Sequence, residues 1–314
     1  MKITGTYVFK QNGEEIGRSQ NIITANGTRA ILQYLTGASQ EWASAIAVGA
    51  IPTTASSADM TLEYEIARSA VTMKSYKYGF PNLIIVKGTL SSEVSANIYE
   101  VGVYPYNTGQ IFGRRDQLII DDFSYSYNWL FSKISGSTVS AIPANSNSSY
   151  YNNFAAQSVY SPRVGTYSLN IPANSTISNS NLSVNLSSYT SLNTFDILVN
   201  VAAGSAGTMT VTLTDVNGNT TSSPLSYSFD ASILSGYQIL STNLPSDIIS
   251  LSSINNIAIN TSGTNSSITL DAMRISLLSE IGDLSGLVSR SVLTTPIAKI
   301  YGTPLDIEYY VQIG

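Results

Sequence analysis

The chain contains no cysteine and no histidine. These absences exclude a zinc site built from cysteine and histidine, thiol catalysis and a Ser-His catalytic triad. They also mean that no disulfide holds the fold, although the missing cysteines say nothing about the cellular compartment.

Charge and long apolar runs are scarce as well. Only 11% of residues are charged and the net charge is −5, a balance that disfavours nucleic-acid binding. The sequence has no run of about 18 apolar residues, so no membrane-spanning helix is predicted. Its opening, MKITGTYVFKQNGEE, lacks the apolar core of a signal peptide. We therefore expect a soluble protein that does not insert into a membrane.

The charge that is present is unevenly spread. Of 15 basic and 20 acidic residues, six lie between Phe123 and Leu270: Lys133, Arg163, Asp196, Asp215, Asp230 and Asp247. Such a composition shift marks a domain boundary. We predict a mainly β protein in which residues 1–121 and 283–314 form one small, discontinuous α+β domain. An antiparallel β-sandwich of the jelly-roll kind is inserted between its halves over 122–282.

The flanking segments predict specific elements. Alternating apolar residues before and after Gln11-Asn12-Gly13 indicate a hairpin, because Asn-Gly accepts the positive φ angles of a type I′ turn. A helix is predicted over 25–34, with Thr24 as N-cap, an apolar stripe of Ile31, Leu32 and Leu35, and Gly37 at the end. We predict strands at 43–48, 83–90 and 96–104. The acidic segment 59–68 is predicted to form one or two helical turns.

The central segment reads as short strands separated by Gly, Pro, Asn or Ser, the pattern of a sandwich. A turn is predicted at Val216-Asn217-Gly218-Asn219. The strands are expected at 124–131, 155–158, 166–171, 181–186, 195–202, 208–215, 225–229, 238–244, 256–260 and 267–277.

Several motifs of the flanks resemble a domain of tailed-bacteriophage virion proteins of the tail-fibre and collar-fibre type. They are Asn21-Ile22-Ile23-Thr24, Ile46-Ala47-Val48-Gly49, the pair Glu65 and Arg68, Tyr99-Glu100-Val101-Gly102-Val103-Tyr104, Ser289-Arg290-Ser291-Val292, Pro296-Ile297-Ala298-Lys299 and Gly302–Tyr309. The resemblance implies an architectural role without catalytic residues. About 160 residues separate its two parts here, which supports an insertion. Taken alone, Glu65 and Arg68 also fit an ordinary exposed ion pair.

The central segment resembles jelly-roll modules of the carbohydrate-binding and galactose-binding-like kind. The likeness rests on Asp122-Phe123 with Trp129, Gly165–Leu169, Thr212–Asn219 and Ile268–Ile275. In that family a calcium ion often ties the first strand to the last. The resemblance thus implies a candidate structural Ca²⁺ site at Asp121, Asp122 and Asp271, whose carboxylates are hard oxygen ligands. Solvated carboxylates at strand ends are the alternative interpretation.

Sugar recognition uses aromatic faces that stack on the rings of the ligand. Tyr125, Tyr127 and Trp129 alternate and so share one strand face, and Tyr150 and Tyr151 lie in a Ser/Asn-rich loop. These five residues are the candidate ligand-binding set. A Tyr/Trp stripe of period two also fits a sandwich core with its polar tips at the rim.

Three function classes follow. The first is a virion structural protein, a tail, neck or collar fibre or a decoration subunit, with other virion proteins as partners. The second is a receptor- or polysaccharide-binding adhesin that contacts a host-surface glycan. The third, a glycan-degrading enzyme, needs two carboxylates flanking the scissile bond, and between Phe123 and Leu270 there is no glutamate. We therefore expect a non-enzymatic protein located in the virion. Closed symmetry makes a homo-oligomer the expectation, a trimer if it is a fibre.

Overall fold

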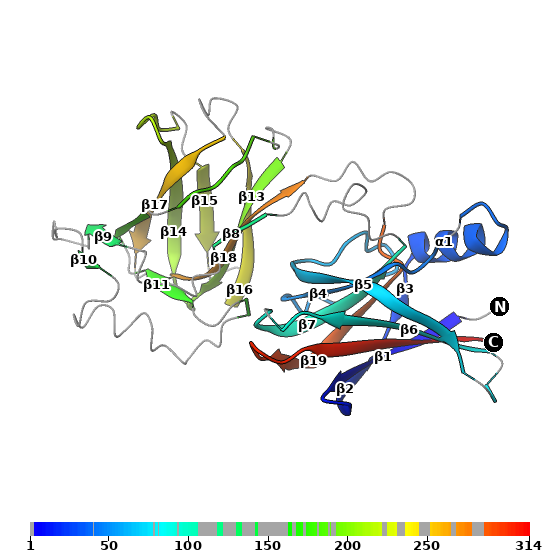
Figure 1. Ribbon diagram of the computed structural model, residues 1–314. Helices are drawn as coiled ribbons and strands as arrows, with labels where there is room; N and C mark the ends of the chain where they lie inside the picture. The colour runs from blue at the N-terminus through cyan, green and yellow to red at the C-terminus, as the bar shows by residue number, and fades with distance from the viewer. Residues whose placement is uncertain are drawn as a thin grey trace. The chain divides into compact units, whose positions relative to one another are not determined.

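The computed structural model divides the chain into two compact units (Figure 1). One, here called the split unit, comprises residues 1–115 and 279–314, and the other, the sandwich, comprises 116–278. The structure describes residues 3–39, 41–77, 79–80, 82–92, 94–105, 118–121, 130–133, 142–143, 163–164, 168–171, 174–180, 182–187, 189, 193–221, 225–230, 236–244, 252–264, 268–277 and 286–314.

The described part of the split unit is one curled antiparallel sheet with a single helix. The described strands follow the order β2-β1-β20-β6-β5-β4-β7-β19-β3. The elements are β1 (Ile3–Gln11), β2 (Glu14–Gln20), β3 (Ile22–Ile23), α1 (Ala25–Leu35), β4 (Ala45–Gly49), β5 (Glu65–Tyr76), β6 (Leu83–Leu90), β7 (Ala96–Tyr104), β19 (Ser289–Lys299) and β20 (Leu305–Ile313).

Local sequence signals account for the first elements. Asn12 and Gly13 have φ angles of 53° and 85°, the left-handed pair that a type I′ turn requires between β1 and β2. Thr24 caps α1, since its hydroxyl accepts a hydrogen bond from the Gly27 N–H at 2.9 Å. The predicted apolar stripe is only partly right. Ile31 is buried, whereas Leu32 and Leu35 are more than half exposed.

The helical turns predicted over 59–68 are wrong. Residues up to 64 form turns and bends, and Glu65 begins the 12-residue strand β5. The register passes from Val48 opposite Ala67 to Gly49 opposite Glu65, which leaves Ile66 as the extra residue of a bulge. The bulge shifts the two-residue period of the strand. An acidic and a basic residue three apart therefore come to lie together without a helix.

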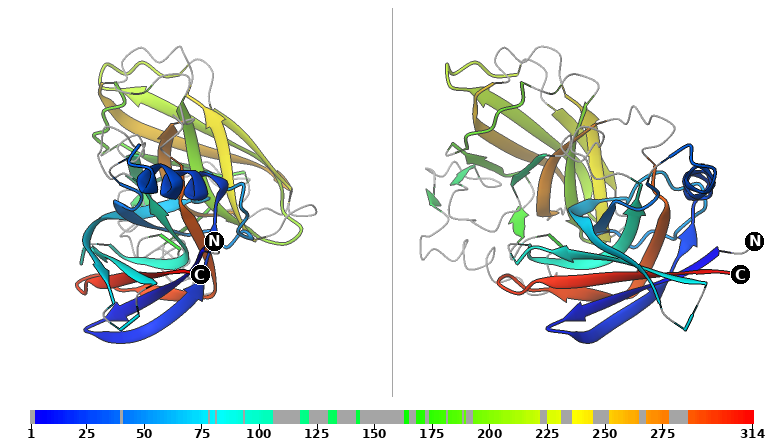
Figure 2. Two further views of the ribbon diagram at one scale, coloured as in Figure 1. Left: turned by 90° about the vertical axis from the view of Figure 1, so that its right-hand side faces the viewer. Right: turned by 45° about the vertical axis from the view of Figure 1, so that its right-hand side comes forward.

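The two C-terminal strands complete the sheet from inside. β20 pairs with β1 on one side and β6 on the other, and β19 lies between β7 and β3. Figure 2 shows the red C-terminal strand running beside the blue N-terminal one. The core between the curled sheet and α1 contains the buried rings of Tyr7, Phe9 and Tyr309. The apolar alternation of these last strands is thus satisfied only within the split unit.

The sandwich consists of two antiparallel sheets around one core. One has the order β10-β9-β12-β17-β14-β15, and the other has the order β11-β18-β13-β16 with β8 paired to β18. Their strands are β8 (Leu118–Asp121), β9 (Leu130–Lys133), β10 (Ile142–Pro143), β11 (Leu169–Ile171), β12 (Thr176–Asn179), β13 (Asn193–Val201), β14 (Ala206–Asp215), β15 (Leu225–Asp230), β16 (Gly236–Asn243), β17 (Ile254–Thr264) and β18 (Ile268–Leu277). A mainly β fold with a jelly-roll sandwich is confirmed.

Period-two alternation builds the core of the sandwich. Met209, Val211 and Leu213 of β14 are buried, as are the three apolar residues of β15, and both sets join one cluster. One sequence prediction differs from this structure, since the described residues 182–186 contribute only an isolated bridge from Val184 to Ile254. The strand predicted at 155–158 lies outside the described residues.

The chain enters the sandwich earlier than the composition shift suggests. β8 ends at Asp121 but pairs with β18, so residues 118–121 belong to the sandwich.

No described helix is long and apolar enough to cross a membrane.

Candidate functional site

The predicted sugar-binding set falls outside the described residues. This holds for Tyr125, Tyr127, Trp129, Tyr150 and Tyr151, and also for Asp122. Of Asp121 only the backbone is described, opposite Met273 at the end of β8. The first and last strands of the sandwich are therefore paired near the predicted Ca²⁺ site, and the ion itself stays a prediction.

Asp271, the third predicted ligand, lies fully buried on β18. Its carboxylate accepts hydrogen bonds from the backbone N–H groups of Arg163 at 2.7 Å and Val164 at 3.2 Å. Burial raises the pKa of this carboxyl to about 7, against the effect of these N–H groups and of the Tyr237 hydroxyl. Among the residues that the structure describes, no three acidic side chains come together as a metal site.

Next to Asp271 the sandwich carries an aromatic and a cationic group. The Arg163 guanidinium lies 4.0 Å from the centre of the Tyr237 ring, and both residues are partly exposed. A guanidinium over a tyrosine face is a cation–π contact. Tyr237 was not in the predicted ligand-binding set, and only the fold sets it beside Arg163 and Asp271.

A second polar row crosses the same sheet. Asp196 of β13 lies opposite Ser241 of β16 and opposite Arg274 of β18. Its carboxylate accepts hydrogen bonds from the Ser241 hydroxyl at 2.7 Å and from Arg274 Nε at 3.1 Å. Phe195 and Ile197 on either side of Asp196 enter the core, so this row occupies the opposite face of the sheet. The signal in the sequence was one acidic residue inside an apolar alternation.

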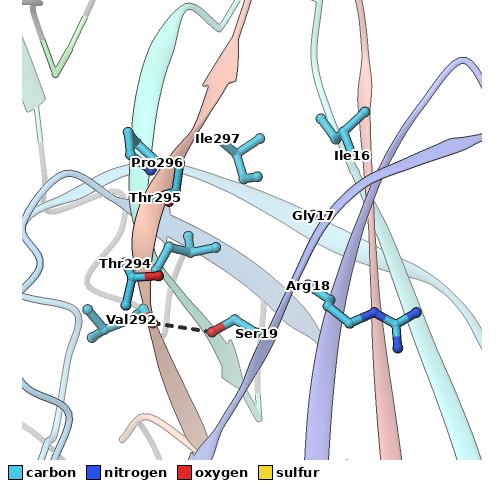
Figure 3. A pocket seen from close by; sticks show the side chains of 10 residues that line it. Ile16, Gly17, Arg18, Ser19, Val292, Thr294, Thr295, Pro296 and Ile297 are labelled. Atoms are coloured by element: carbon cyan, nitrogen blue, oxygen red, sulfur yellow. Dashed lines mark hydrogen bonds between the residues drawn. The ribbon is translucent and has the colours of Figure 1, made fainter.

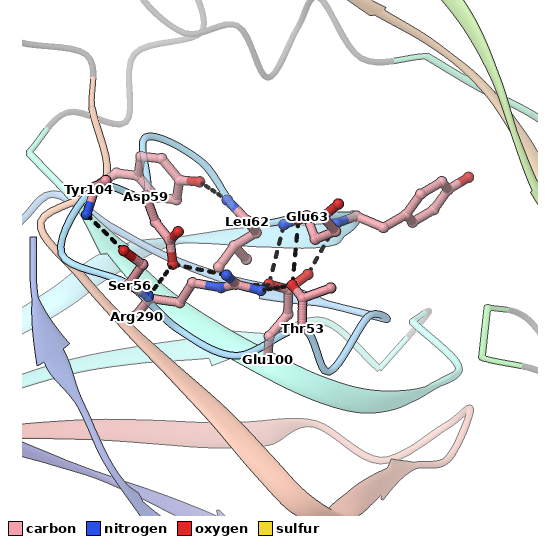
Figure 4. A network of polar contacts seen from close by, with 10 residues as sticks. Thr53, Ser56, Asp59, Leu62, Glu63, Glu100, Tyr104 and Arg290 are labelled. Carbon is pink, nitrogen blue, oxygen red and sulfur yellow. Dashed lines mark hydrogen bonds and ion pairs between the residues drawn. The ribbon is translucent and has the colours of Figure 1, made fainter. Parts of the chain in front are cut away.

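In the split unit, polar groups converge on Arg290 of β19 (Figure 4). Its guanidinium lies 2.7 Å from Glu100 and 2.8 Å from Asp59, and it donates to the Thr53 hydroxyl at 2.8 Å. Glu100 also accepts the backbone N–H groups of Glu63 and Tyr64. Burial raises the pKa of the Glu100 carboxyl above its usual range, although Arg290 and these N–H groups act against the rise.

These contacts join the two separated parts of the virion-type resemblance. Glu100 belongs to the part before the insertion and Arg290 to the part after it, and both are at most 2% exposed. Lys299, from the second part, is also buried and donates to the carbonyls of Val94 and Ile300. Glu65 and Arg68 form a buried pair at 3.0 Å rather than an exposed one. These five charged motif residues thus form contacts inside the sheet.

One groove opens at the surface of the split unit, between β2 and β19 (Figure 3). Its volume is about 330 Å³, and it is lined by Ile16–Ser19 on one side and Val292–Ile297 on the other. Aliphatic and hydroxyl-bearing residues and Arg18 form its walls, with no acidic side chain in the lining. The sequence offered no signal for it.

Comparison with known proteins gives only distant likenesses. The chain resembles the agarase AgWH50C at 12% identity, with 53% of this chain and 25% of that one covered and a TM-score of 0.34. It resembles a family 11 carbohydrate-binding module from Clostridium thermocellum at 12% identity, covering 52% and 98% with a TM-score of 0.33. For the xylan-binding module CBM15 the values are 14%, 52%, 98% and 0.31.

The chain therefore spans about a quarter of the agarase and nearly all of the two binding modules. With TM-scores this low, these likenesses carry no argument about function. No protein-family model matches the chain, and no curated protein sequence matches it.

Proposed function

We propose that this chain is a structural, non-enzymatic subunit of a bacteriophage virion. It would be a tail-fibre, neck, collar-fibre or decoration component. In this proposal the split unit anchors the protein to other virion proteins, and the inserted sandwich is displayed outward. The sequence resemblance of the flanks supplies the virion assignment.

The observation that carries the proposal is the burial of the Glu100–Arg290 pair, which lies 2.7 Å apart. Charged groups that act on a substrate must be reachable by it, whereas these are closed off inside a sheet. Removing one partner of such a pair destabilises a fold strongly. The residues behind the resemblance therefore support an architectural role.

The way each unit ends supports display of an inserted module. In the split unit Val103, near the end of β7, lies opposite Ser289 at the start of β19. In the sandwich Leu118, at the start of β8, lies opposite Ile275 near the end of β18. Insertions are tolerated where the two ends of a module lie close together. Each unit thus has neighbouring ends, the geometry of a module carried by a host.

The test is to purify phage particles from a culture in which the gene for this chain is present. We expect peptides of the chain in the mass spectrum of intact particles. Antibodies against residues 116–278 should label an outward position in electron micrographs. Particles that are fully assembled and infectious but free of the chain would contradict the proposal.

A second candidate function is host attachment through a glycan, and the contact of Tyr237 with Arg163 favours it. A partly exposed ring can stack on a sugar, and charged neighbours can bind its hydroxyls. A glycan array probed with the full chain tests this function. Tyr237→Ala should abolish a signal that Tyr301→Ala, a change at an exposed tyrosine of the split unit, leaves intact. An array without any signal argues for the purely structural role.

A further inference from the structure

β2 is the outermost described strand on its side of the split-unit sheet, and its outer edge faces β19 across the groove. At one end this seam is closed. The Ser291 hydroxyl lies 2.6 Å from that of Ser19, which in turn donates to the Val292 carbonyl at 3.2 Å. Toward Ile16 the seam opens into the groove (Figure 3).

The seam opens because β19 is irregular there. Its register on β7 passes from Val292 opposite Glu100 to Ile297 opposite Ile98. Four residues of β19, from 293 to 296, thus lie against a single residue of β7, and such an excess makes a strand bow. Pro296 within this stretch has no N–H to offer to a neighbouring strand. β19 is therefore poorly suited to complete the edge of β2.

The pairing of β2 with β1 shows which of its backbone groups face outward. The Asn21 N–H donates to the Gly5 carbonyl, so these two residues form a hydrogen-bonded pair. Pairs with and without mutual hydrogen bonds alternate along an antiparallel ladder. Arg18, opposite Val8, then directs its backbone N–H and C=O away from β1. The register next passes from Gly17 opposite Phe9 to Glu15 opposite Lys10, so Ile16 is an extra, bulged residue.

Because of the bulge, the next residue whose backbone N–H and C=O point away from β1 is Glu15, three positions from Arg18. In a regular strand outward-facing residues are two positions apart, so a regular strand cannot match both of these. A second copy of β2 running antiparallel has the same spacing. It places its own Arg18 opposite Glu15 and its own Glu15 opposite Arg18.

Charge completes this match. The Glu15 and Arg18 side chains are 38% and 65% exposed and already form an ion pair at 2.6 Å within one chain. Opposite charges placed directly across an antiparallel pair stabilise it, and like charges destabilise it. We propose that two copies of the protein associate through β2, in antiparallel two-fold pairing along the groove, with Glu15 of each copy facing the second copy's Arg18. This interface goes beyond the proposed function and does not depend on it.

Sedimentation velocity of the full chain over a range of concentrations tests the pairing. We expect a reversible dimer. Arg18→Glu alone, and Glu15→Arg alone, put like charges across the pair and should each raise the dissociation constant by about tenfold or more. The double variant Glu15→Arg/Arg18→Glu restores opposite charges and should dimerise like the unmodified protein. Glu14→Arg, the same charge change at the next residue, is the matched control and should have the smaller effect.

Mixing the two single variants gives the sharpest result. Each repels itself, but one carries two acidic and the other two basic residues at these positions, so the mixture should form heterodimers. Circular dichroism of each variant establishes that these exposed substitutions leave the fold intact. A monomer at all concentrations, a trimer, or a dimer that both single variants preserve would overturn the proposal.

Discussion

The split unit and the sandwich place their charged residues differently. In the split unit, ion pairs cross neighbouring strands on a partly exposed face, as Lys10–Glu308 and Lys87–Asp306 do, each at 2.7 Å. In the sandwich, four of the described charged residues are buried: Asp196, Asp215, Asp271 and Arg274. These four charged residues fix strands and loops from within the sandwich, whereas Asp230 is exposed and Arg163 is partly exposed.

This comparison shows what charge does in each unit. Exposed ion pairs contribute little to stability and weaken in salt, whereas buried ones cannot be removed singly without leaving an uncompensated charge. The split unit has both kinds: partly exposed ion pairs between neighbouring strands, and the buried ion pairs of Arg290. In the sandwich, the ion pair of Asp196 with Arg274 is of the buried kind.

The largest expected effect comes from removing the C-terminal strands. Deleting residues 279–314 takes β19 and β20 out of the middle of the split-unit sheet and exposes apolar edges. We expect the split unit not to fold, as judged by loss of its cooperative unfolding transition. Replacing 116–278 by a short Gly/Ser linker should keep that transition, because closure entropy changes slowly with loop length. The reverse pattern would show that β19 and β20 do not belong to this unit.

The next largest effect concerns the buried ion pair of Arg290 with Glu100. Arg290→Met leaves Glu100 without its cation and should lower the unfolding free energy of the split unit by about 3–5 kcal/mol. Chemical denaturation measures it. Lys74→Met, at the exposed pair of Lys74 with Glu41, is the control and should leave the value unchanged within error. The double variant Arg290→Met/Glu100→Gln should recover part of the loss. Equal effects of Arg290→Met and Lys74→Met would refute the distinction between buried and exposed pairs.

A comparable effect is expected from pH in the sandwich. Burial raises the pKa of Asp271 from the usual 3.8 to about 7, so the folded state holds a proton that the unfolded state releases. The stability linked to this proton is fully present below about pH 4 and is lost as pH rises through about 7. We expect a fall of about 4 kcal/mol at most between these limits. Urea titrations should show this component in the unmodified chain and not in Asp271→Asn. Parallel pH profiles for the two proteins would contradict it.

Calcium should have a smaller effect. If Asp121, Asp122 and Asp271 hold the ion, free Ca²⁺ at ten times its dissociation constant should stabilise the sandwich by about 1.4 kcal/mol. Thermal melts with Ca²⁺, with EDTA and with Mg²⁺ as the control measure this. A melting temperature that does not respond to Ca²⁺ would rule out the predicted site.

Salt should produce the smallest difference between the two units, measured as a shift of the melting temperature. Raising NaCl to about 0.5 M screens exposed charges and barely reaches buried ones. We expect a small downward shift of the melting temperature of the split unit and none for the sandwich, measured by calorimetry on one sample. A sandwich that responds more strongly than the split unit would mean that its buried charges are accessible to ions.

Local signals predicted much of the fold. The strands at 83–90 and 96–104, the hairpin turn at Asn12-Gly13 and the cap at Thr24 each depend on neighbouring residues, and the structure has them as expected. β5 was missed because a bulge at Ile66 brings Glu65 and Arg68 together at a spacing that also fits a helix.

The polar sites depend on register between distant strands. Asp196 and Arg274 are 78 residues apart, and Glu100 and Arg290 are 190 apart. No local pattern fixes such pairs, because strand order and register are set by the whole sheet. The groove between β2 and β19 arises from two bulges, which the alternation of a single strand does not reveal.

The strand order also determines when, during translation, each unit can fold. β20 lies between β1 and β6, so the split unit cannot close its sheet until the final residues have been made. All the described strands of the sandwich have been made once Leu277 has been translated. At about 5–20 residues per second, β1 to β7 wait roughly 10–40 s for their missing neighbours. During that interval the inserted module can already fold beside an unfinished host, whose open apolar strands are the segments that a chaperone would need to hold.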